Sequence, residues 1–297
     1  MRTRLVEAAF TVVALACPAL SGAQSITLLP GQPREIPFQL TSGYLVVVEG
    51  NIGDSQGFHF IIDTGTTRTC IDRRLAQKLA LPLDPHTVFR FGKPVRLNST
   101  HLPALALGPL RAENFTINVA DLSHLNVSGI QIDAIVGLDL LESFPFQIDY
   151  EQMRISFGSL RTLAESASME AVPWLPVVSL YVGRFKCRVL VATGARNIVF
   201  YSERVKGTSY NLKPMGRQIW ADSIGGIVEA RRALLQGVSL SERGAVEVYL
   251  INAPLNGPLS STDGILSPVA FGIRQIGFDF DNHIISWTRS GFGQGPD

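Results

Sequence analysis

The stretch Phe60-Ile61-Ile62-Asp63-Thr64-Gly65-Thr66 returns later in the chain as Val189-Leu190-Val191-Ala192-Thr193-Gly194-Ala195. Each copy is an apolar run rich in β-forming residues, followed by a Thr-Gly pair. Glycine at the end of a strand permits a tight turn at little steric cost. We therefore predict two equivalent strands that each end in a tight loop, with the Asp63 carboxylate at the tip of the first loop.

Three further pairs of segments repeat at this spacing or at a spacing one residue longer. They are Ala104-Leu105-Ala106-Leu107-Gly108 with Ala233-Leu234-Leu235-Gln236-Gly237, Asp133-Ala134-Ile135-Val136-Gly137 with Asp263-Gly264-Ile265-Leu266-Ser267, and Phe146-Gln147-Ile148-Asp149-Tyr150 with Ile276-Gly277-Phe278-Asp279-Phe280. Self-similarity at a fixed spacing indicates a duplicated architecture. We predict two tandem repeats, residues 36–158 and 174–290, joined by a small and polar linker at 159–173.

Strand signals recur along the whole chain, as short runs of Val, Ile, Leu and Phe broken by Gly, Pro, Asn and Asp. The expected strands are 43–49, 58–62, 115–120, 146–157, 177–182, 188–191, 246–252 and 276–287. One helical pattern, 72–79, begins with a capping aspartate and places Leu75, Ala76 and Leu79 on one side. The predicted fold class is therefore all-β.

The first 23 residues have the layout of a cleavable secretory signal: two arginines, an apolar stretch, and small residues before Gln24. A membrane anchor would need about 20 apolar residues, and Glu7 and Pro18 interrupt this stretch. A lipoprotein signal ending at Cys17 is a second alternative. We expect an exported protein, periplasmic or secreted, with no membrane span in the mature chain.

The composition limits the partners and cofactors. Lys and Arg number 26 against 25 for Asp and Glu, so no nucleic-acid partner is indicated. Apolar residues make up 46% of the chain, enough for a well-filled core. The histidines and cysteines show no ligand spacing, so we expect no metal and no cofactor. Cys70 and Cys187 lie in apolar, strand-like contexts, where we expect two buried thiols and no disulfide.

The segments FIIDTGTTRTCI at 60–71 and IDAIVGLDLL at 132–141 resemble those of the retropepsin-like aspartic peptidases. The resemblance covers nearly all of 36–158 and, more weakly, 174–290. It implies two β-barrel repeats related by a pseudo-twofold axis, with Ile135-Val136-Gly137 packed beneath the aspartate loop. It also implies a catalytic role for Asp63.

The same resemblance assigns supporting roles in the two loops to Thr64, Gly65 and Thr66 and to Thr193 and Gly194. The threonine hydroxyls of such loops lock the two turns together by hydrogen bonds. In the family, two hairpin flaps close over the substrate, and they are expected here at 89–103 and 219–231. Trp220 either lines a peptide groove or belongs to the core.

The second loop departs from the family pattern because Ala192 stands where a second aspartate is expected. The second repeat also has Ser267 where the first has Gly137, and Arg196 follows its loop. Family chemistry uses two carboxylates that share a proton and split their titrations. Without a partner, Asp63 is expected to ionise near an ordinary carboxyl pKa and to act as a base with no matching acid.

Three functions remain open at this point. The first is an endopeptidase that hydrolyses peptide bonds through an Asp63-activated water, with a second carboxylate supplied by a homodimer or by Asp72 or Asp222. The second is a pseudo-peptidase that binds extended peptides in the cleft between the repeats by strand addition. The third is a structural or assembly factor. The expected partner is thus a polypeptide substrate or a peptide ligand.

Overall fold

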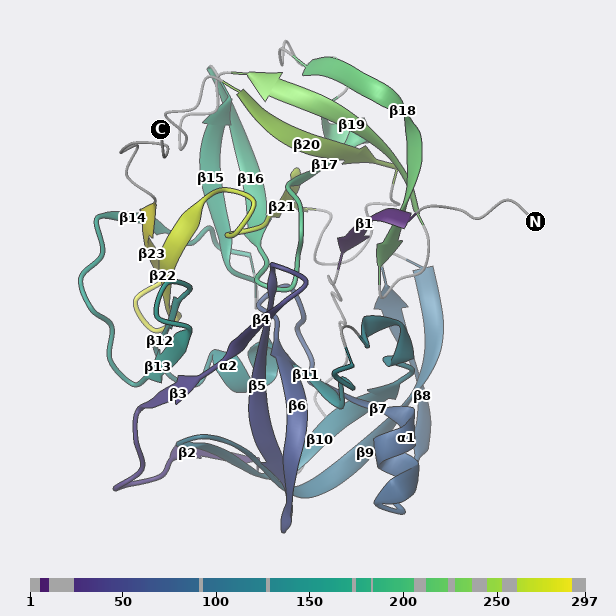
Figure 1. Ribbon diagram of the computed structural model, residues 1–297, viewed down its shortest axis with the longest axis vertical. Helices are drawn as coiled ribbons and strands as arrows, with labels where there is room; N and C mark the ends of the chain where they lie inside the picture. The colour runs from purple at the N-terminus through teal and green to yellow at the C-terminus, as the bar shows by residue number, and fades with distance from the viewer. Residues whose placement is uncertain are drawn as a thin grey trace.

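The computed structural model describes residues 6–10, 24–90, 93–126, 129–172, 175–182, 184–205, 212–223, 228–236, 245–252 and 261–289. Within these ranges the chain is mainly β and forms three sheets (Figure 1). The helices there are short: α1 (Arg73–Lys78), α2 (Leu138–Leu141), α3 (Ser202–Val205) and the 3-10 turn η1 (Ser123–Leu125). The predicted all-β class is confirmed at this level.

The first sheet is built from the N-terminal half and occupies the lower part of Figure 1. Its strand order is β2-β10-β7-β11-β6-β5-β9-β8, with β4 paired to β5. An additional pairing of β10 with β9 closes the sheet into a barrel. The bounds are β2 (Ser25–Leu28), β4 (Gln39–Thr41), β5 (Leu45–Ile52), β6 (Ser55–Ile62), β7 (Cys70–Asp72), β8 (Asp84–Arg90), β9 (Lys93–Leu107), β10 (Leu110–Ala120) and β11 (Ala134–Val136).

The second sheet is built from the C-terminal half except for its edge strand β1, in the order β1-β18-β19-β20-β17-β21-β16-β15. Its bounds are β1 (Val6–Phe10), β15 (Val177–Val182), β16 (Phe185–Val191), β17 (Val199–Tyr201), β18 (Leu212–Ser223), β19 (Val228–Gln236), β20 (Ala245–Ile251) and β21 (Gly264–Leu266). In both sheets a strand that ends before a Thr-Gly loop pairs in parallel with a short three-residue strand, β6 with β11 and β16 with β21. Each short strand then pairs antiparallel with the strand that follows the loop, β7 or β17.

A six-stranded sheet joins the two halves, in the order β14-β23-β22-β12-β13-β3. Its bounds are β3 (Glu35–Pro37), β12 (Phe146–Asp149), β13 (Arg154–Phe157), β14 (Glu165–Ser168), β22 (Ile273–Asp279) and β23 (Ile284–Arg289). At its centre β12 pairs antiparallel with β22, with Phe146 opposite Phe278. The two buried rings stack at a centroid distance of 4.9 Å. One hairpin from each half of the chain is therefore part of a single sheet.

The predicted helix is confirmed as α1. Asp72 is its N-cap, and its carboxylate accepts a hydrogen bond from the Arg74 amide, which satisfies one of the unpaired donors of the first turn. Leu75 and Ala76 are buried against the barrel.

Two predicted segments have more structure than expected. The linker 159–173 contains β14, which pairs with β23 and so extends the shared sheet. Of the predicted leader, the structure describes only β1, whose backbone pairs in parallel with β18. The expected flaps correspond to the hairpins β8–β9 and β18–β19. Their tips, and the side chain of Trp220, lie outside the described part of the structure.

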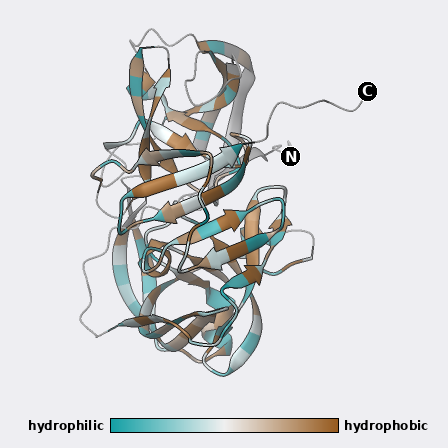
Figure 2. Cartoon of the chain, turned by 90° about the vertical axis from the view of Figure 1, so that its left-hand side faces the viewer, coloured by the Kyte–Doolittle hydropathy of each residue, from teal (hydrophilic) through white to brown (hydrophobic). Residues whose placement is uncertain are grey.

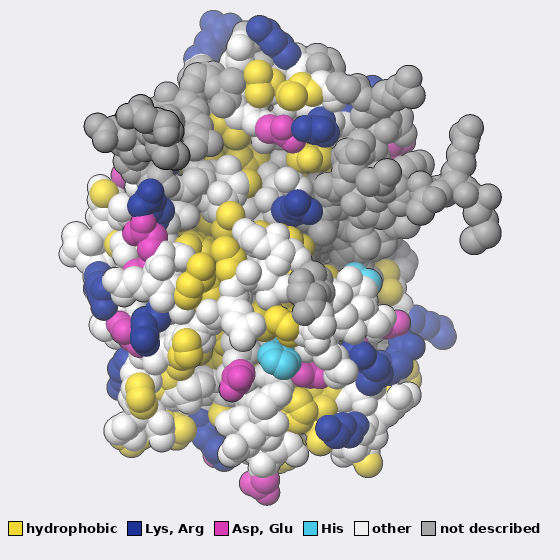
Figure 3. Space-filling model, in the orientation of Figure 1, with side chains coloured by type: hydrophobic (Ala, Val, Ile, Leu, Met, Phe, Trp, Pro, Cys, Tyr) yellow, Lys and Arg dark blue, Asp and Glu magenta, His cyan; other side chains and the backbone are white. Residues whose placement is uncertain are grey.

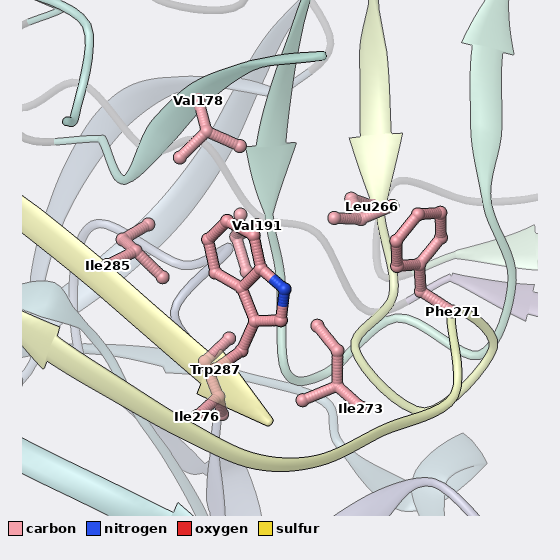
Figure 4. A pocket seen from close by; sticks show the side chains of 8 residues that line it. All are labelled: Val178, Val191, Leu266, Phe271, Ile273, Ile276, Ile285 and Trp287. Atoms are coloured by element: carbon pink, nitrogen blue, oxygen red, sulfur yellow. The ribbon is translucent and has the colours of Figure 1, made fainter. Parts of the chain in front are cut away.

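Buried apolar side chains fill the interior of both halves. Figure 2 shows hydrophobic and hydrophilic residues alternating along several of the strands. Cys70 and Cys187 are two buried thiols, as predicted. A small cavity between β16 and the shared sheet is lined only by apolar side chains and the Trp287 ring (Figure 4). This cavity is part of the core and not a polar site.

The described surface carries basic and acidic side chains interspersed on the face shown in Figure 3, in keeping with the net charge of +1. Among the described helices none has the length and the apolar character needed to span a membrane.

We predict that Phe278→Ala destabilises the whole chain by about 3–5 kcal/mol, because it removes a fully buried ring from the sheet that joins the halves. Urea unfolding followed by far-UV circular dichroism measures this change. Met153→Ala, at an exposed position, is the control. A loss below 1 kcal/mol for Phe278→Ala would show that the shared sheet contributes little to stability.

Candidate functional site

Asp63 lies directly after β6, where the chain leaves the barrel sheet. The Asp63 amide donates to the Val136 carbonyl oxygen at 3.1 Å, which continues the parallel pairing with β11 by one residue. The Thr66 amide donates to the Asp63 carbonyl oxygen at 3.2 Å and closes a turn. The apolar strand and the tight turn after it are found as predicted, but Asp63 lies at the start of the loop and not at its tip, because its amide continues the pairing with β11.

Three donors bind the Asp63 carboxylate. Oδ1 accepts from the amide of Gly65 at 2.8 Å and from the amide of Gly194 at 3.0 Å. Oδ2 accepts from the Thr66 hydroxyl at 2.8 Å. The side chain is fully buried. One of these donors, Gly194, comes from the other half of the chain, so both loops contribute to the carboxylate's environment.

Gly194 approaches Asp63 so closely that no side chain fits between them. A Cβ atom at this position would lie 2.5 Å from the Asp63 Cγ atom. Because real Cβ atoms do not come so near to a carboxyl carbon, glycine is required for the amide of residue 194 to reach Oδ1.

The pKa of Asp63 is raised from the ordinary 3.8 to about 6, chiefly because burial removes the carboxylate from water. The hydrogen bonds from Thr66, Gly65 and Gly194 oppose this rise. The expectation of an ordinary pKa for a lone Asp63 is therefore wrong. The absence of a second charge does not keep the pKa at its ordinary value, because burial alone disfavours the ionised form.

Thr64 and Thr193 bind the two loops to each other. The Thr64 hydroxyl donates to the Val191 carbonyl oxygen at 2.7 Å, and the Thr193 hydroxyl donates to the Ile62 carbonyl oxygen at 2.8 Å. Each hydroxyl also accepts from the amide of the other threonine, at 3.1 Å in both cases. These four reciprocal bonds between buried groups fix the position of one loop relative to the other.

The second loop has backbone hydrogen bonds like those of the first, with alanines in place of Asp63 and Thr66. The Ala192 amide donates to the Leu266 carbonyl oxygen at 3.0 Å, and the Ala195 amide donates to the Ala192 carbonyl oxygen at 3.2 Å. Ala192 and Ala195 are buried in an apolar cluster that includes Leu138 and Leu190. Methyl groups therefore occupy the places where the first loop carries Asp63 and Thr66.

Of the two alternative acids, the structure describes the side chain of Asp72, whose partners lie away from Asp63. Asp72 uses its carboxylate to cap α1, to bind Arg74 Nε at 2.6 Å and to accept from the Leu122 amide at 2.8 Å. The side chain of Asp222 lies outside the described part of the structure. Among the described residues, no group of three or more His, Cys, Asp or Glu side chains is arranged to hold a metal ion.

The sequence analysis gave no role to Asp139 and Thr69, which lie beside the site. Asp139 accepts hydrogen bonds from both the amide and the hydroxyl of Thr69. Both residues stand inside the two segments that carry the resemblance. Their contact joins positions 70 residues apart, and no local pattern indicates it.

Residues 48–140 match a family model described as aspartyl protease. The matched segment extends from β5 to α2 and contains Asp63, its loop and Gly137, but it covers less than half of the chain. The match supports an aspartic protease family for this segment. A search of curated proteins found no match.

We predict that Asp63→Asn stabilises the chain at neutral pH. The pKa of Asp63 is higher in the folded chain than in the unfolded chain, so folding opposes its ionisation. The cost is absent below pH 3.8, grows as the pH rises to about 6, and reaches about 3 kcal/mol above that. Asparagine keeps the shape and carries no charge, so the variant avoids this cost.

The measurement is urea unfolding of the wild type and Asp63→Asn at pH 4 and pH 7. A gain at pH 7 that largely disappears at pH 4 is expected, and Asp281→Asn controls for the loss of an exposed carboxylate. An equal effect at both pH values would contradict a raised pKa for Asp63.

Proposed function

We propose that the chain is an endopeptidase of the aspartic type, in which the Asp63 carboxylate activates a water molecule for attack on a peptide bond. The observation that carries the proposal is the state of Asp63, which lies in the segment that matches the aspartyl protease model. Its carboxylate is buried, has a pKa of about 6 and accepts hydrogen bonds from three donors, one of them the Gly194 amide of the other half. A group with a pKa near the working pH is suited to proton transfer. The expected substrate is an extended polypeptide.

We also propose that 36–158 and 174–290 are tandem repeats related by a pseudo-twofold axis, with Ala192 at the degenerate second position. Three observations support this arrangement. The bonds between Thr64 and Thr193 are reciprocal. The amides of Asp63 and Ala192 make corresponding bonds to Val136 and Leu266. The shared sheet contains one hairpin from each half.

In a homodimer that paired two Asp63 carboxylates, the Asp63 loop of the second copy would need the place beside Asp63. The second loop of the same chain is bound there. Thr193 and Gly194 of the same chain already bind Thr64 and Asp63 there. We therefore propose that Asp63 works without a carboxylate from a homodimer partner.

A single carboxylate can complete the reaction if it serves first as base and then as acid. Ionised Asp63 takes one proton from water while the water oxygen bonds to the carbonyl carbon of the scissile peptide. The protonated carboxyl then gives that proton to the leaving nitrogen as the C–N bond breaks, which regenerates the carboxylate. Among the described residues, no acid is placed to protonate the carbonyl oxygen, and such an acid contributes about 10²- to 10⁴-fold to rates.

The second candidate function is peptide binding without cleavage, in the cleft between the halves. The observation that favours it is the burial of Ala192 and Ala195 among mainly apolar side chains, which leaves the second loop with no carboxylate at these two positions. Export from the cytoplasm through the leader 1–23 is proposed for either function and rests on the sequence pattern alone.

We predict slow cleavage of an unfolded protein by residues 24–297, with a rate that rises with pH through about 6 and then levels off, because the base is ionised Asp63. Product formation is followed by mass spectrometry between pH 3 and 8. Asp63→Ala is the control and should be inactive. No cleavage at any pH by the folded wild-type chain would reject the endopeptidase and favour the peptide-binding function.

The double variant Ala192→Asp with Ala195→Thr tests the proposed correspondence of the two loops. If the loops are equivalent, it places a second carboxylate and its hydroxyl donor opposite Asp63. The two like charges then share a proton, and cleavage at acidic pH should increase by about 10²- to 10⁴-fold. Ala192→Asn with Ala195→Thr is the matched control. A folded double variant without this gain would show that position 192 does not face Asp63 as proposed.

A further inference from the structure

Asp139 and Thr69 form a polar contact beneath the Asp63 loop. The Thr69 amide lies 2.9 Å from both carboxylate oxygens of Asp139, and the Thr69 hydroxyl donates to Oδ1 at 2.7 Å. The same hydroxyl accepts from the Gly137 amide at 3.1 Å. Asp139 lies in α2, and Thr69 lies at the end of the segment that follows Asp63, so the contact attaches this segment to the helix.

The backbone of α2 hydrogen-bonds the segment that contains Thr66, one of the donors to Asp63. The Leu138 amide donates to the Thr66 carbonyl oxygen at 2.8 Å, and the Asp139 amide donates to the Thr67 carbonyl oxygen at 3.2 Å. Thr66 is the residue whose hydroxyl binds Oδ2 of Asp63. Asp139 is therefore connected to Asp63 through the Thr66–Thr69 segment, which α2 holds at both ends.

The corresponding positions in the other half of the chain are apolar. At the spacing that pairs Asp63 with Ala192 and Thr66 with Ala195, Thr69 corresponds to Ile198. At the spacing that pairs Gly137 with Ser267, Asp139 corresponds to Val269. Ile198 is buried, and Val269 is partly buried against the core.

The second loop nevertheless keeps its turn. The Ala195 amide still bonds the Ala192 carbonyl, and the Phe271 amide donates to the Ser267 carbonyl at 3.1 Å, as the Leu141 amide does to the Gly137 carbonyl. A loop of this kind therefore folds without the Asp–Thr contact. The Thr69–Asp139 contact is present in the half that carries Asp63. In the half that carries Ala192, apolar residues stand at both positions.

We propose that Asp139 is a positioning residue, which fixes the Thr66–Thr69 segment through Thr69 and so aims the Thr66 hydroxyl at Asp63. As far as cleavage is concerned, this inference rests on the proposed function. Asp139 itself faces the charged side chains of Arg68 and Glu142. Burial, which outweighs the bonds from Thr69, raises the pKa of Asp139 to about 6.

Loosening the Thr66–Thr69 segment is expected to change the pKa of Asp63 in one direction. The Thr66 hydroxyl bond lowers the pKa of Asp63 against the effect of burial. When the segment loosens, this bond weakens, and the pKa of Asp63 should rise. Misaligned acid–base groups lose rate more than substrate affinity. A purely structural role for Asp139 would instead lower stability and leave the titration of Asp63 unchanged in the folded protein.

Two variants and one matched control test the inference. Asp139→Asn replaces one acceptor of the contact by a donor, and Thr69→Ile with Asp139→Val copies the apolar pair of the other half. Asp133→Asn is the control, because Asp133 is a buried aspartate of the same half that binds the His59 amide and Gln131 and does not contact the Asp63 loop. Thermal unfolding identifies the folded variants.

The main readout is the titration of the Asp63 carboxyl carbon by NMR, which requires no catalytic activity. Both variants should raise the pKa of Asp63, and the control should not. If the wild type cleaves, kcat should fall about tenfold in both variants, with KM changed less than twofold. If the wild type does not cleave, the endopeptidase fails while the titration still decides the role of Asp139.

Two results would overturn the inference. The first is an Asp63 titration in both folded variants that matches the control. The second is a failure of both variants to fold, since Asp139 would then be needed for the fold itself.

Discussion

The reciprocal hydrogen bonds between Thr64 and Thr193 are the constraint on which the centre of the molecule depends. Two hydroxyls and two amides, all buried, satisfy one another and the carbonyl oxygens of Ile62 and Val191. Leaving a buried polar group unpaired costs about 1–3 kcal/mol of stability, so separating the two loops is energetically unfavourable. This lock brings the Gly194 amide to Asp63, and it couples the environment of the carboxylate to both halves of the chain.

The polar groups around this lock are distributed unequally. Asp63, Thr66, Thr69 and Asp139 all lie in the first half, and the corresponding positions in the second half are apolar. The backbone hydrogen bonds of the two loops nevertheless correspond. The backbone arrangement of the second loop is thus kept although these four positions are apolar, while the threonine and glycine of the lock remain. The cost in stability that burial imposes on Asp63 does not arise at Ala192, which carries no charge.

Much of this arrangement could be predicted from the sequence. The strand before Asp63, the turn after it and the capped helix α1 follow from local patterns that need only neighbouring residues. The pKa of Asp63 could not be predicted, because burial depends on everything that packs around the loop. The strand β14 was missed for a similar reason: Glu165-Ser166-Ala167-Ser168 has little intrinsic strand preference, and its pairing with β23 decides its conformation. The contact between Thr69 and Asp139 joins two segments whose proximity only the fold provides.

Because the two halves share one sheet within one chain, substitutions in one Thr-Gly loop are independent of substitutions in the other. In an assembly of identical chains, a substitution in a loop appears in every copy of that loop at once. Here β12–β13 and β22–β23 belong to one polypeptide, so each side of the centre is encoded separately. One loop can therefore drift toward an apolar, purely supporting surface while the other keeps its carboxylate, and the two can acquire different tasks within the same folded unit.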